Sequence, residues 1–249
     1  GGPQQGGGMN NNETGQAGIT RLFSEPLVTE ASWLLPLALM SIFLAGITLV
    51  SEQRALRMQS TQSKSDSPDT ALRLQAQEQS LSAQGLGNKW LALLLWSLWL
   101  IPVMMYFSFT TGLFHRYYLI MLGPAIAALT GMAFWAIAQL FKRNRWLGFG
   151  TLLFIVAVTL GFQASMLSNY DTASWVLPTA ILMALAGLFT LALGGASGSR
   201  VVHNAALSII LLAMLIAPAT WATMATLNED PNVALPTATI NDSQPTTFM

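Results

Sequence analysis

Four consecutive side chains form the group in this sequence that is best suited to binding chemistry: His115, Arg116, Tyr117 and Tyr118. The guanidinium of Arg116 is planar and permanently charged, and it can bind phosphate oxygens through two parallel hydrogen bonds. The imidazole of His115 and the two tyrosine hydroxyls could add hydrogen bonds. We call these residues the 115–118 cluster. At a membrane boundary it would meet a lipid-linked phosphate at headgroup depth. The alternative is structural, with Arg116 extending toward water and the tyrosines in an aromatic belt.

The composition removes several other kinds of chemistry. The chain has no cysteine, which excludes disulfides, thiolate catalysis and cysteine-ligated metals. Its two histidines, His115 and His203, are too few for a histidine metal cluster. Eleven basic and eleven acidic residues give a net charge of zero, which argues against nucleic acid as a partner. We assign no metal site, cofactor or catalytic residue within this chain.

The elements that must position the cluster are membrane-spanning helices. Only 9% of the 249 residues are charged, against roughly 25% in soluble domains. A bilayer-spanning helix needs about 20 apolar residues. Six stretches meet this requirement, at 32–50, 90–109, 117–141, 146–166, 175–193 and 205–224. The sequence therefore predicts an all-α polytopic membrane protein whose spanning domain covers 32–224.

The basic residues predict how these spans are oriented. Nine of the eleven lie on alternate connections, in the loop 51–89, in the turn after the third span and at Arg200. Cytoplasmic loops carry such an excess. The remaining two, Arg21 and Arg116, fall on the opposite side. We therefore expect residues 1–31 and 225–249 to be extracytoplasmic.

An extracytoplasmic segment before the first span has to be translocated. The Gly-, Gln- and Asn-rich start of the chain does not resemble a secretory signal. We therefore expect this chain to be the C-terminal part of a longer membrane protein.

Two features of the predicted spans bear on function. None contains Asp, Glu, Lys or Arg, which disfavours an ion-coupled transporter because such proteins keep charges at mid-membrane. Five spans each carry one proline toward the predicted outer side: Pro36, Pro102, Pro124, Pro178 and Pro218. Proline removes a backbone donor and tends to kink a helix, so the outer halves could splay into a cavity. Alternatively, these are prolines of the kind that membrane helices commonly tolerate.

Three further segments carry structural expectations. Gly123, Ala127 and Gly131 recur every four residues, which predicts close approach of a neighbouring helix. The loop 51–89 is polar, with a short surface helix expected near 70–81. The stretch 12–29 is interpreted as a solvated linker before the membrane, or alternatively as a short interfacial helix.

Two runs of the sequence resemble a known family. They are NETGQAGITRLFSEPLVTEASWLLPLAL and FSFTTGLFHRYYLIMLGPAIAALTG. Both are similar to a bacterial branch of the protein mannosyltransferase-like GT-C glycosyltransferases, which are often described as 4-amino-4-deoxy-L-arabinose transferases or related mannosyltransferases. The resemblance covers most of residues 8–136 and continues more weakly to 228–236.

This resemblance implies a GT-C-like helical bundle in the bacterial cytoplasmic membrane. Such enzymes transfer a sugar from a polyprenyl-phosphate carrier to an acceptor on the outer face. Their catalytic acidic residue lies in an early outer loop that this chain does not contain. The resemblance thus implies three partners: the polyprenyl-phosphate sugar donor, membrane lipid and an N-terminal half of the same protein, which could also hold a divalent metal. His115, Arg116, Tyr117 and Tyr118 would line the carrier-phosphate side. The alternative is half of a transporter or flippase, or a membrane assembly subunit without catalysis.

Overall fold

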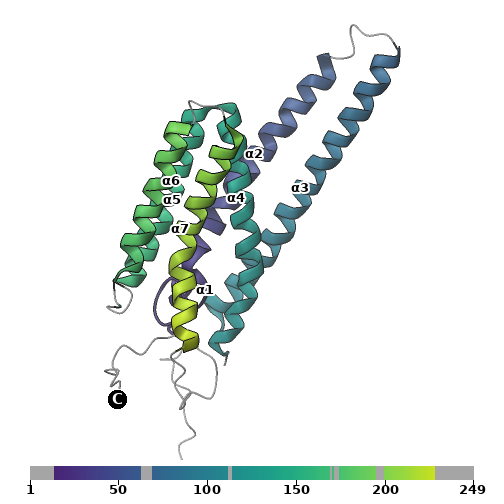
Figure 1. Ribbon diagram of the computed structural model, residues 1–249. Helices are drawn as coiled ribbons and strands as arrows, with labels where there is room; N and C mark the ends of the chain where they lie inside the picture. Colours follow the sequence, from purple (N-terminus) through teal and green to yellow (C-terminus); the bar gives the residue numbers. More distant parts are fainter. Residues whose placement is uncertain are drawn as a thin grey trace, which may run out of the picture.

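The fold is an all-helical bundle, seen in a computed structural model that describes residues 14–62, 69–111, 114–168, 170, 174–194 and 199–227. Every element within these ranges is helical. The 3-10 helices are η1 (Arg21–Phe23), η2 (Ser32–Leu34) and η3 (Arg116–Leu122). The α-helices are α1 (Val28–Ala31), α2 (Leu35–Gln62), α3 (Asp69–Phe109), α4 (Gly123–Arg143), α5 (Arg145–Leu167), α6 (Val176–Gly194) and α7 (Arg200–Leu227) (Figure 1).

The predicted number of spans is confirmed. Six helical segments of the described chain are long and apolar enough to cross a membrane: Val28–Met58, Ser80–Phe109, Arg116–Arg143, Arg145–Leu167, Val176–Gly194 and Arg200–Leu227. They alternate in direction, so α1 and the last turn of α7 lie at one end of the bundle (Figure 1). We call this the Arg21 end, and the opposite end, with the turn at Asn144, the Asn144 end. The assignment of the Arg21 end to the outer side remains a prediction.

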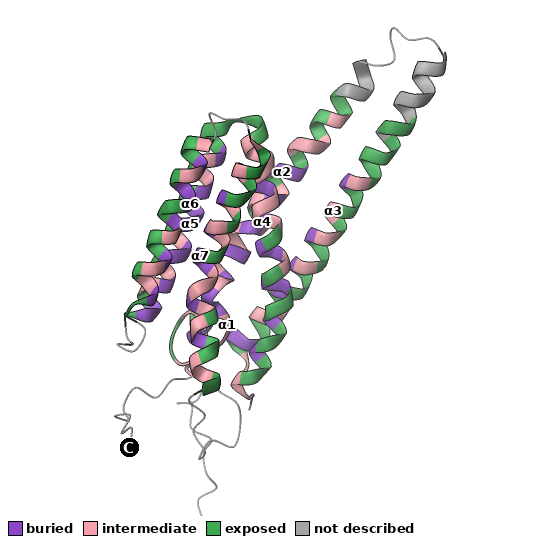
Figure 2. Ribbon diagram, in the orientation of Figure 1, coloured by how far each residue is buried: buried purple, intermediate pink, exposed green. Residues whose placement is uncertain are grey.

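The connection between the first two spans differs from the expected polar loop. Helix α2 continues to Gln62 and α3 begins at Asp69, so the two project as a helical hairpin beyond the other helices (Figures 1 and 2). The helical part is therefore much longer than the predicted segment 70–81. The physical reason is composition, because Ala, Leu, Gln, Arg and Glu are all favourable in helices.

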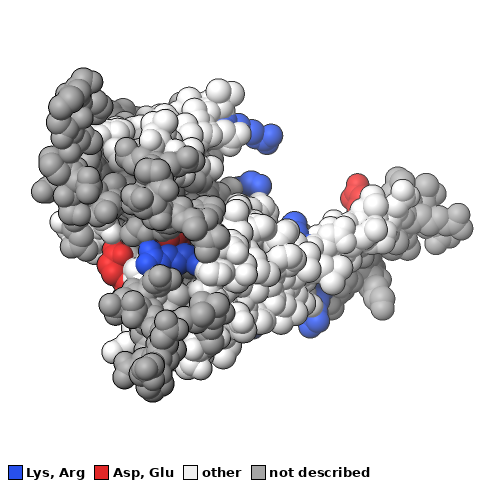
Figure 3. Space-filling view, turned by 90° about the horizontal axis from the view of Figure 1, so that it is seen from below, with Lys and Arg blue, Asp and Glu red and all other residues white. Residues whose placement is uncertain are grey.

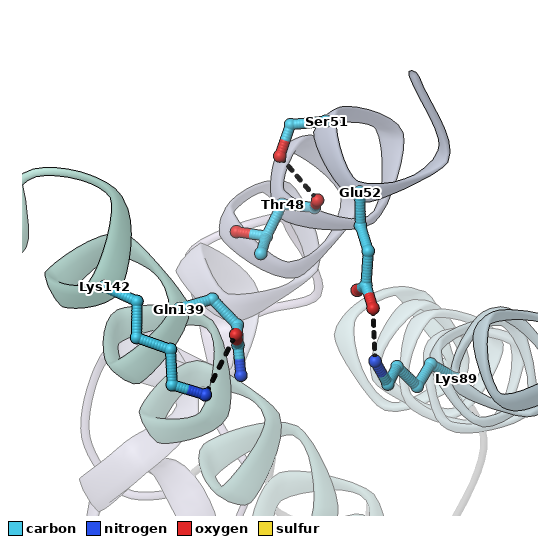
Figure 4. Close-up of polar contacts among 6 residues, drawn as sticks. All are labelled: Thr48, Ser51, Glu52, Lys89, Gln139 and Lys142. Carbon is cyan, nitrogen blue, oxygen red and sulfur yellow. Dashed lines mark hydrogen bonds and ion pairs between the residues drawn. The ribbon is translucent and has the colours of Figure 1, made fainter. Parts of the chain in front are cut away.

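An ion pair joins the two helices where the hairpin leaves the bundle (Figure 4). Lys89 Nζ lies 2.6 Å from Glu52 Oε1 and 5.0 Å from the centroid of the Trp135 ring on α4. In the same region Lys142 Nζ donates to Gln139 Oε1 at 3.4 Å. The two contacts of Lys89 connect α2, α3 and α4, whereas the bond between Lys142 and Gln139 lies within α4.

Asn144 itself forms the turn between α4 and α5. Its side-chain oxygen accepts from the backbone N–H groups of Trp146 and Leu147, at 2.9 and 3.2 Å. This is an N-cap, which satisfies donors that the first helical turn leaves free. The next residue, Arg145, donates through Nη2 to the carbonyl of Ala192 near the end of α6, at 2.7 Å.

Three of the five prolines lie in the first turn of a helix and not in its interior. Pro36 and Pro124 are the second residues of α2 and α4, and Pro178 is the third residue of α6. In a first turn the missing N–H has no intrahelical partner to lose, so proline fits there without a kink. Only Pro102 and Pro218 lie inside their helices.

The outward-opening cavity, one of the two interpretations of the prolines, remains a prediction. An apolar groove does lie between α5 and α6, lined by Phe149, Leu153, Leu185, Leu188, Phe189 and Ala192. Several of these residues are near the Asn144 end, away from the predicted outer side. In a bilayer, such an apolar groove suits acyl chains.

Pro218 explains a buried glutamine. Because proline has no N–H, it leaves the carbonyl of Met214, four residues earlier, without its usual helical donor. Gln163 on α5 is 0% exposed, and its Nε2 donates to Met214 O at 2.9 Å and to Trp33 O at 3.3 Å. Within a membrane a backbone carbonyl has to be satisfied by protein, and Gln163 provides this donor.

The small-residue stripe on α4 does not pack as predicted. Gly123, Ala127 and Gly131 are exposed, and a Cβ added at Gly123 or Gly131 would meet no atom within 4 Å. Close approach occurs instead between α6 and α7. A Cβ at Gly187 would lie 2.6 Å from Ile210 Cγ1 and 3.1 Å from the carbonyl of Ala206. The spacing alone could not show which helix face has a neighbour.

Candidate functional site

The segment before the first span is part of the packed Arg21 end. Leu22, Leu27 and Val28 are buried there, and the Ser32 hydroxyl donates to the carbonyl of Leu22. From Arg21 onward the segment is thus packed against the bundle and is not a solvated linker, whereas Gln16, Ala17, Ile19 and Thr20 are exposed. It folds back against the end of the bundle through η1 and α1.

Arg21 ties this segment to the end of α3. Its side chain is 5% exposed. Nη1 donates to the carbonyls of Thr110 at 2.6 Å and Phe107 at 3.2 Å. Nε and Nη2 donate to the carbonyl and hydroxyl of Thr14, at 2.7 and 2.8 Å, and the guanidinium carbon lies 4.8 Å from the Phe114 ring centroid. Burial lowers the pKa of Arg21, but a guanidinium stays charged in proteins.

The last carbonyls of a helix have no partner within the helix, and they form the negative end of its dipole. At the end of α3 they are satisfied by the N-terminal segment. In addition to the two bonds from Arg21, the backbone N–H of Gly18 donates to the carbonyl of Ser108 at 2.8 Å. The segment therefore serves as a tertiary C-cap for α3.

The 115–118 cluster follows directly after this cap. The rings of His115 and Tyr117 are stacked, with centroids 5.4 Å apart and an interplanar angle of 7°. Tyr118 packs edge-on against both, at 5.8 Å from His115 and 4.6 Å from Tyr117. Tyr117 and Tyr118 are 36% and 40% exposed, while His115 and Arg116 are half-buried. The structure thus brings the three predicted rings together, with Arg116 within the same run.

The cluster lies on a 3-10 helix, not on the α-helical span expected from 117 to 141. Element η3 covers Arg116–Leu122, and the N–H of Gly123 donates three residues back to Ile120. Pro124 has no N–H to continue an α-helical ladder backwards, which favours this change of helix type. Trp99 on α3 holds η3 by donating from Nε1 to the carbonyl of Met121, at 2.9 Å.

A second set of aromatic residues at the Arg21 end is buried. The Tyr170 hydroxyl donates to Glu25 Oε1 at 3.0 Å, and its ring lies 4.6 Å from that of Trp221. Trp221 in turn lies 5.5 Å from Trp33, whose Nε1 donates to the carbonyl of Thr29 at 2.9 Å. Because both tryptophans are almost fully buried, their rings pack the bundle end, while Tyr170 is half-buried.

Acidic and basic side chains lie beside one another on the Arg21 end (Figure 3). Among the described residues, no group of three or more His, Asp or Glu side chains is arranged to hold a metal ion. The 115–118 cluster offers a guanidinium, an imidazole and two hydroxyls, which together can bind an anion through hydrogen bonds.

The sequence identified the 115–118 cluster but not Arg21. Arg21 and its α3 partners are more than 80 residues apart in the chain, so no local spacing connects them. The single available signal was a positive charge on the side of the membrane where positive charges are few.

Comparison with known proteins finds two relatives whose names describe them as putative mannosyltransferases. The chain is similar to "Putative mannosyltransferase YycA" of Bacillus subtilis (strain 168), with 31% identity over 214 residues, or 84% of this chain and 26% of the relative. It is also similar to "Putative mannosyltransferase YkcB" of the same organism, with 29% identity over 228 residues, or 88% of this chain and 26% of that relative. The chain thus spans about a quarter of the length of these relatives. No protein-family model matches the sequence, and no solved structure was found to match the chain.

Proposed function

Because this chain belongs to the mannosyltransferase-like glycosyltransferase family, we propose that it is the C-terminal membrane portion of a bacterial enzyme that transfers a sugar from a polyprenyl-phosphate-linked donor. The acceptor would be modified at the outer face of the cytoplasmic membrane. The six apolar helices support a multi-pass membrane enzyme. The relatives' greater length supports a partner segment, because this chain matches only about a quarter of each.

The observation that carries the proposal is the stacked 115–118 cluster at the Arg21 end. As the bond between sugar and carrier breaks, negative charge develops on the leaving polyprenyl phosphate. Fixed cationic and hydroxyl donors stabilise such charge when they are already in place. In this proposal Arg116 binds the phosphate, His115 assists, and the exposed parts of Tyr117 and Tyr118 offer hydroxyls. The polyprenyl tail would lie among the membrane helices.

The chain's own contribution would be binding and charge stabilisation. The acidic residue that activates the acceptor, and any divalent metal, would come from an N-terminal half of the same protein. Membrane lipid would surround both parts.

The proposal can be tested by lipid binding to the purified chain. Native mass spectrometry in detergent would compare a polyprenyl phosphate with the matching polyprenol and with phosphatidate. We expect the polyprenyl phosphate to bind best, because it joins the long tail to the phosphate. Replacing Arg116→Gln should weaken its binding about tenfold or more, since hydrogen bonds to charged groups contribute about 1.5–3 kcal/mol.

Arg143→Gln provides the matched control, because Arg143 is an exposed arginine at the other end of α4. It should bind the polyprenyl phosphate as the unchanged chain does. Equal binding of the phosphate and the alcohol, or unchanged binding by Arg116→Gln, would remove the phosphate-binding role.

A further inference from the structure

We propose that Arg21 is a positioning residue that holds the 115–118 cluster in its binding geometry by connecting the end of α3 to Phe114. The inference rests on the proposed function for its consequence, the binding of a lipid phosphate. Its structural basis is independent of that function, because it depends on contacts of Arg21 alone.

The first step is the cap on α3. Arg21 Nη1 donates to both Phe107 O and Thr110 O, so one nitrogen fixes where the helix ends and where the chain leaves it. Thr14 accepts from the other two nitrogens. The guanidinium fork can hold all these acceptors together in one plane, which an ammonium group cannot do.

The second step leads from the cap to the cluster. Phe114 is 4% exposed and lies under the Arg21 guanidinium, at 4.8 Å. Its ring also packs on Phe107 of α3, with centroids 5.2 Å apart. Phe114 immediately precedes His115, whose ring begins the stack. Arg21 therefore contacts the chain both where it leaves α3 and directly before the cluster, and movement of either contact would move His115.

The third step concerns charge. Among the described residues, the partners that the structure gives Arg21 are carbonyls, a hydroxyl and an aromatic ring. Burying a charge without a carboxylate is costly unless many hydrogen bonds compensate. A neutral glutamine would remove this charge but could satisfy fewer acceptors. The cap thus depends on arginine specifically, and a lysine should replace it only in part.

The experiment measures the geometry of the cluster directly. Diethyl pyrocarbonate modifies accessible imidazoles, and mass spectrometry of peptides reports the rate at His115 separately from that at His203. In the folded chain, stacking on Tyr117 shields His115. We expect Arg21→Gln to raise the modification rate of His115 about threefold or more, with Arg21→Lys in between and the rate at His203 unchanged.

Two further variants make this result specific. Phe114→Leu removes the ring under the guanidinium and keeps the α3 cap, so it should also raise the rate at His115. Arg145→Gln is the matched control, because Arg145 likewise donates to a carbonyl near a helix end, that of Ala192 at the end of α6. It should leave His115 unchanged. If Arg21→Gln does not fold, as judged by cooperative thermal unfolding, Phe114→Leu decides the question.

Binding of polyprenyl phosphate separates positioning from general stability. Arg21→Gln should weaken this binding by roughly three- to tenfold, within the range of indirect coupling between residues, and leave polyprenol binding unchanged. An unchanged His115 rate in both Arg21→Gln and Phe114→Leu would overturn the positioning role. If the unchanged chain binds no polyprenyl phosphate while the His115 rate still rises, the proposed function fails and the positioning role stands.

Discussion

Replacing Gln163→Leu should destabilise the bundle, and it should do so because of Pro218. The substitution keeps the side chain's approximate size and removes the Nε2 donor from a site that is 0% exposed. Two carbonyls lose a partner: Met214 O at 2.9 Å and Trp33 O at 3.3 Å. Hydrogen bonds between membrane helices contribute about 0.6 kcal/mol on average and up to about 1.7, so the loss should be about 1–3 kcal/mol. Gln163 Oε1 has no partner among the described residues, and its removal offsets part of this loss.

The decisive measurement is a double-mutant cycle with Pro218→Ala. Alanine restores an N–H at position 218 that can donate to Met214 O within α7. In this background Gln163→Leu loses only the weaker bond to Trp33. Its cost should therefore fall by about half, which gives a coupling free energy of about 0.6–1.7 kcal/mol between the two positions.

Reversible unfolding in mixed detergent micelles, followed by tryptophan fluorescence, would give the four free energies of unfolding. Gln139→Leu is the control, because this glutamine near the Asn144 end accepts from the exposed Lys142 at 3.4 Å. It should change the free energy of unfolding by less than about 0.5 kcal/mol. Strictly additive effects of Gln163→Leu and Pro218→Ala would refute the argument that the glutamine replaces the donor that proline lacks.

Two further predictions follow from packing and charge. Gly187→Ala should destabilise the chain by about 1–3 kcal/mol by overpacking, because its Cβ would lie 2.6 Å from Ile210 Cγ1. The control Gly131→Ala has open space around it and should be neutral or stabilising. Thermal unfolding midpoints that shift equally in the two variants would contradict this prediction. Glu52→Gln breaks the ion pair with Lys89. Because both side chains are more than a third exposed, the free energy of unfolding should fall by less than about 1 kcal/mol, and by still less in high salt. A larger loss that salt does not reduce would contradict the assignment of this pair as solvent-exposed.

The spans could be predicted because a membrane helix is specified locally. A run of about 20 apolar residues is enough to indicate a membrane-spanning helix, and all six predicted segments correspond to helices. The ends of the helices could not be predicted as well, because polar residues also form good helix. Thus α2 continues to Gln62 and α3 begins at Asp69, well beyond the apolar residues that indicated them.

The features that prediction missed depend on distant neighbours. The consequence of Pro36 or Pro178 depends on where its helix begins, since the first turn tolerates proline and the interior does not. The stripe at Gly123, Ala127 and Gly131 has helix-packing spacing but no neighbour in the described part of the chain. The 115–118 cluster was predictable because its residues are consecutive, whereas its support by Arg21 comes from across the fold. Its binding of phosphate remains a prediction.

Arg21 also changes the argument about Arg116. Arg21 and Arg116 are the two basic residues on the predicted outer side, where basic residues are few. A basic residue in such a place suggests a functional role. The structure supplies a structural explanation for Arg21, which is buried against the end of α3. Arg116 instead lies within the run of stacked rings, half-buried beside two partly exposed tyrosines. If the two arginines act together, Arg21 fixes the position of the 115–118 cluster and Arg116 binds the ligand. Arg21→Gln should then weaken phosphate binding less than Arg116→Gln does, and the double variant should lose less binding free energy than the sum of the two single losses, because part of the effect of Arg21 passes through Arg116.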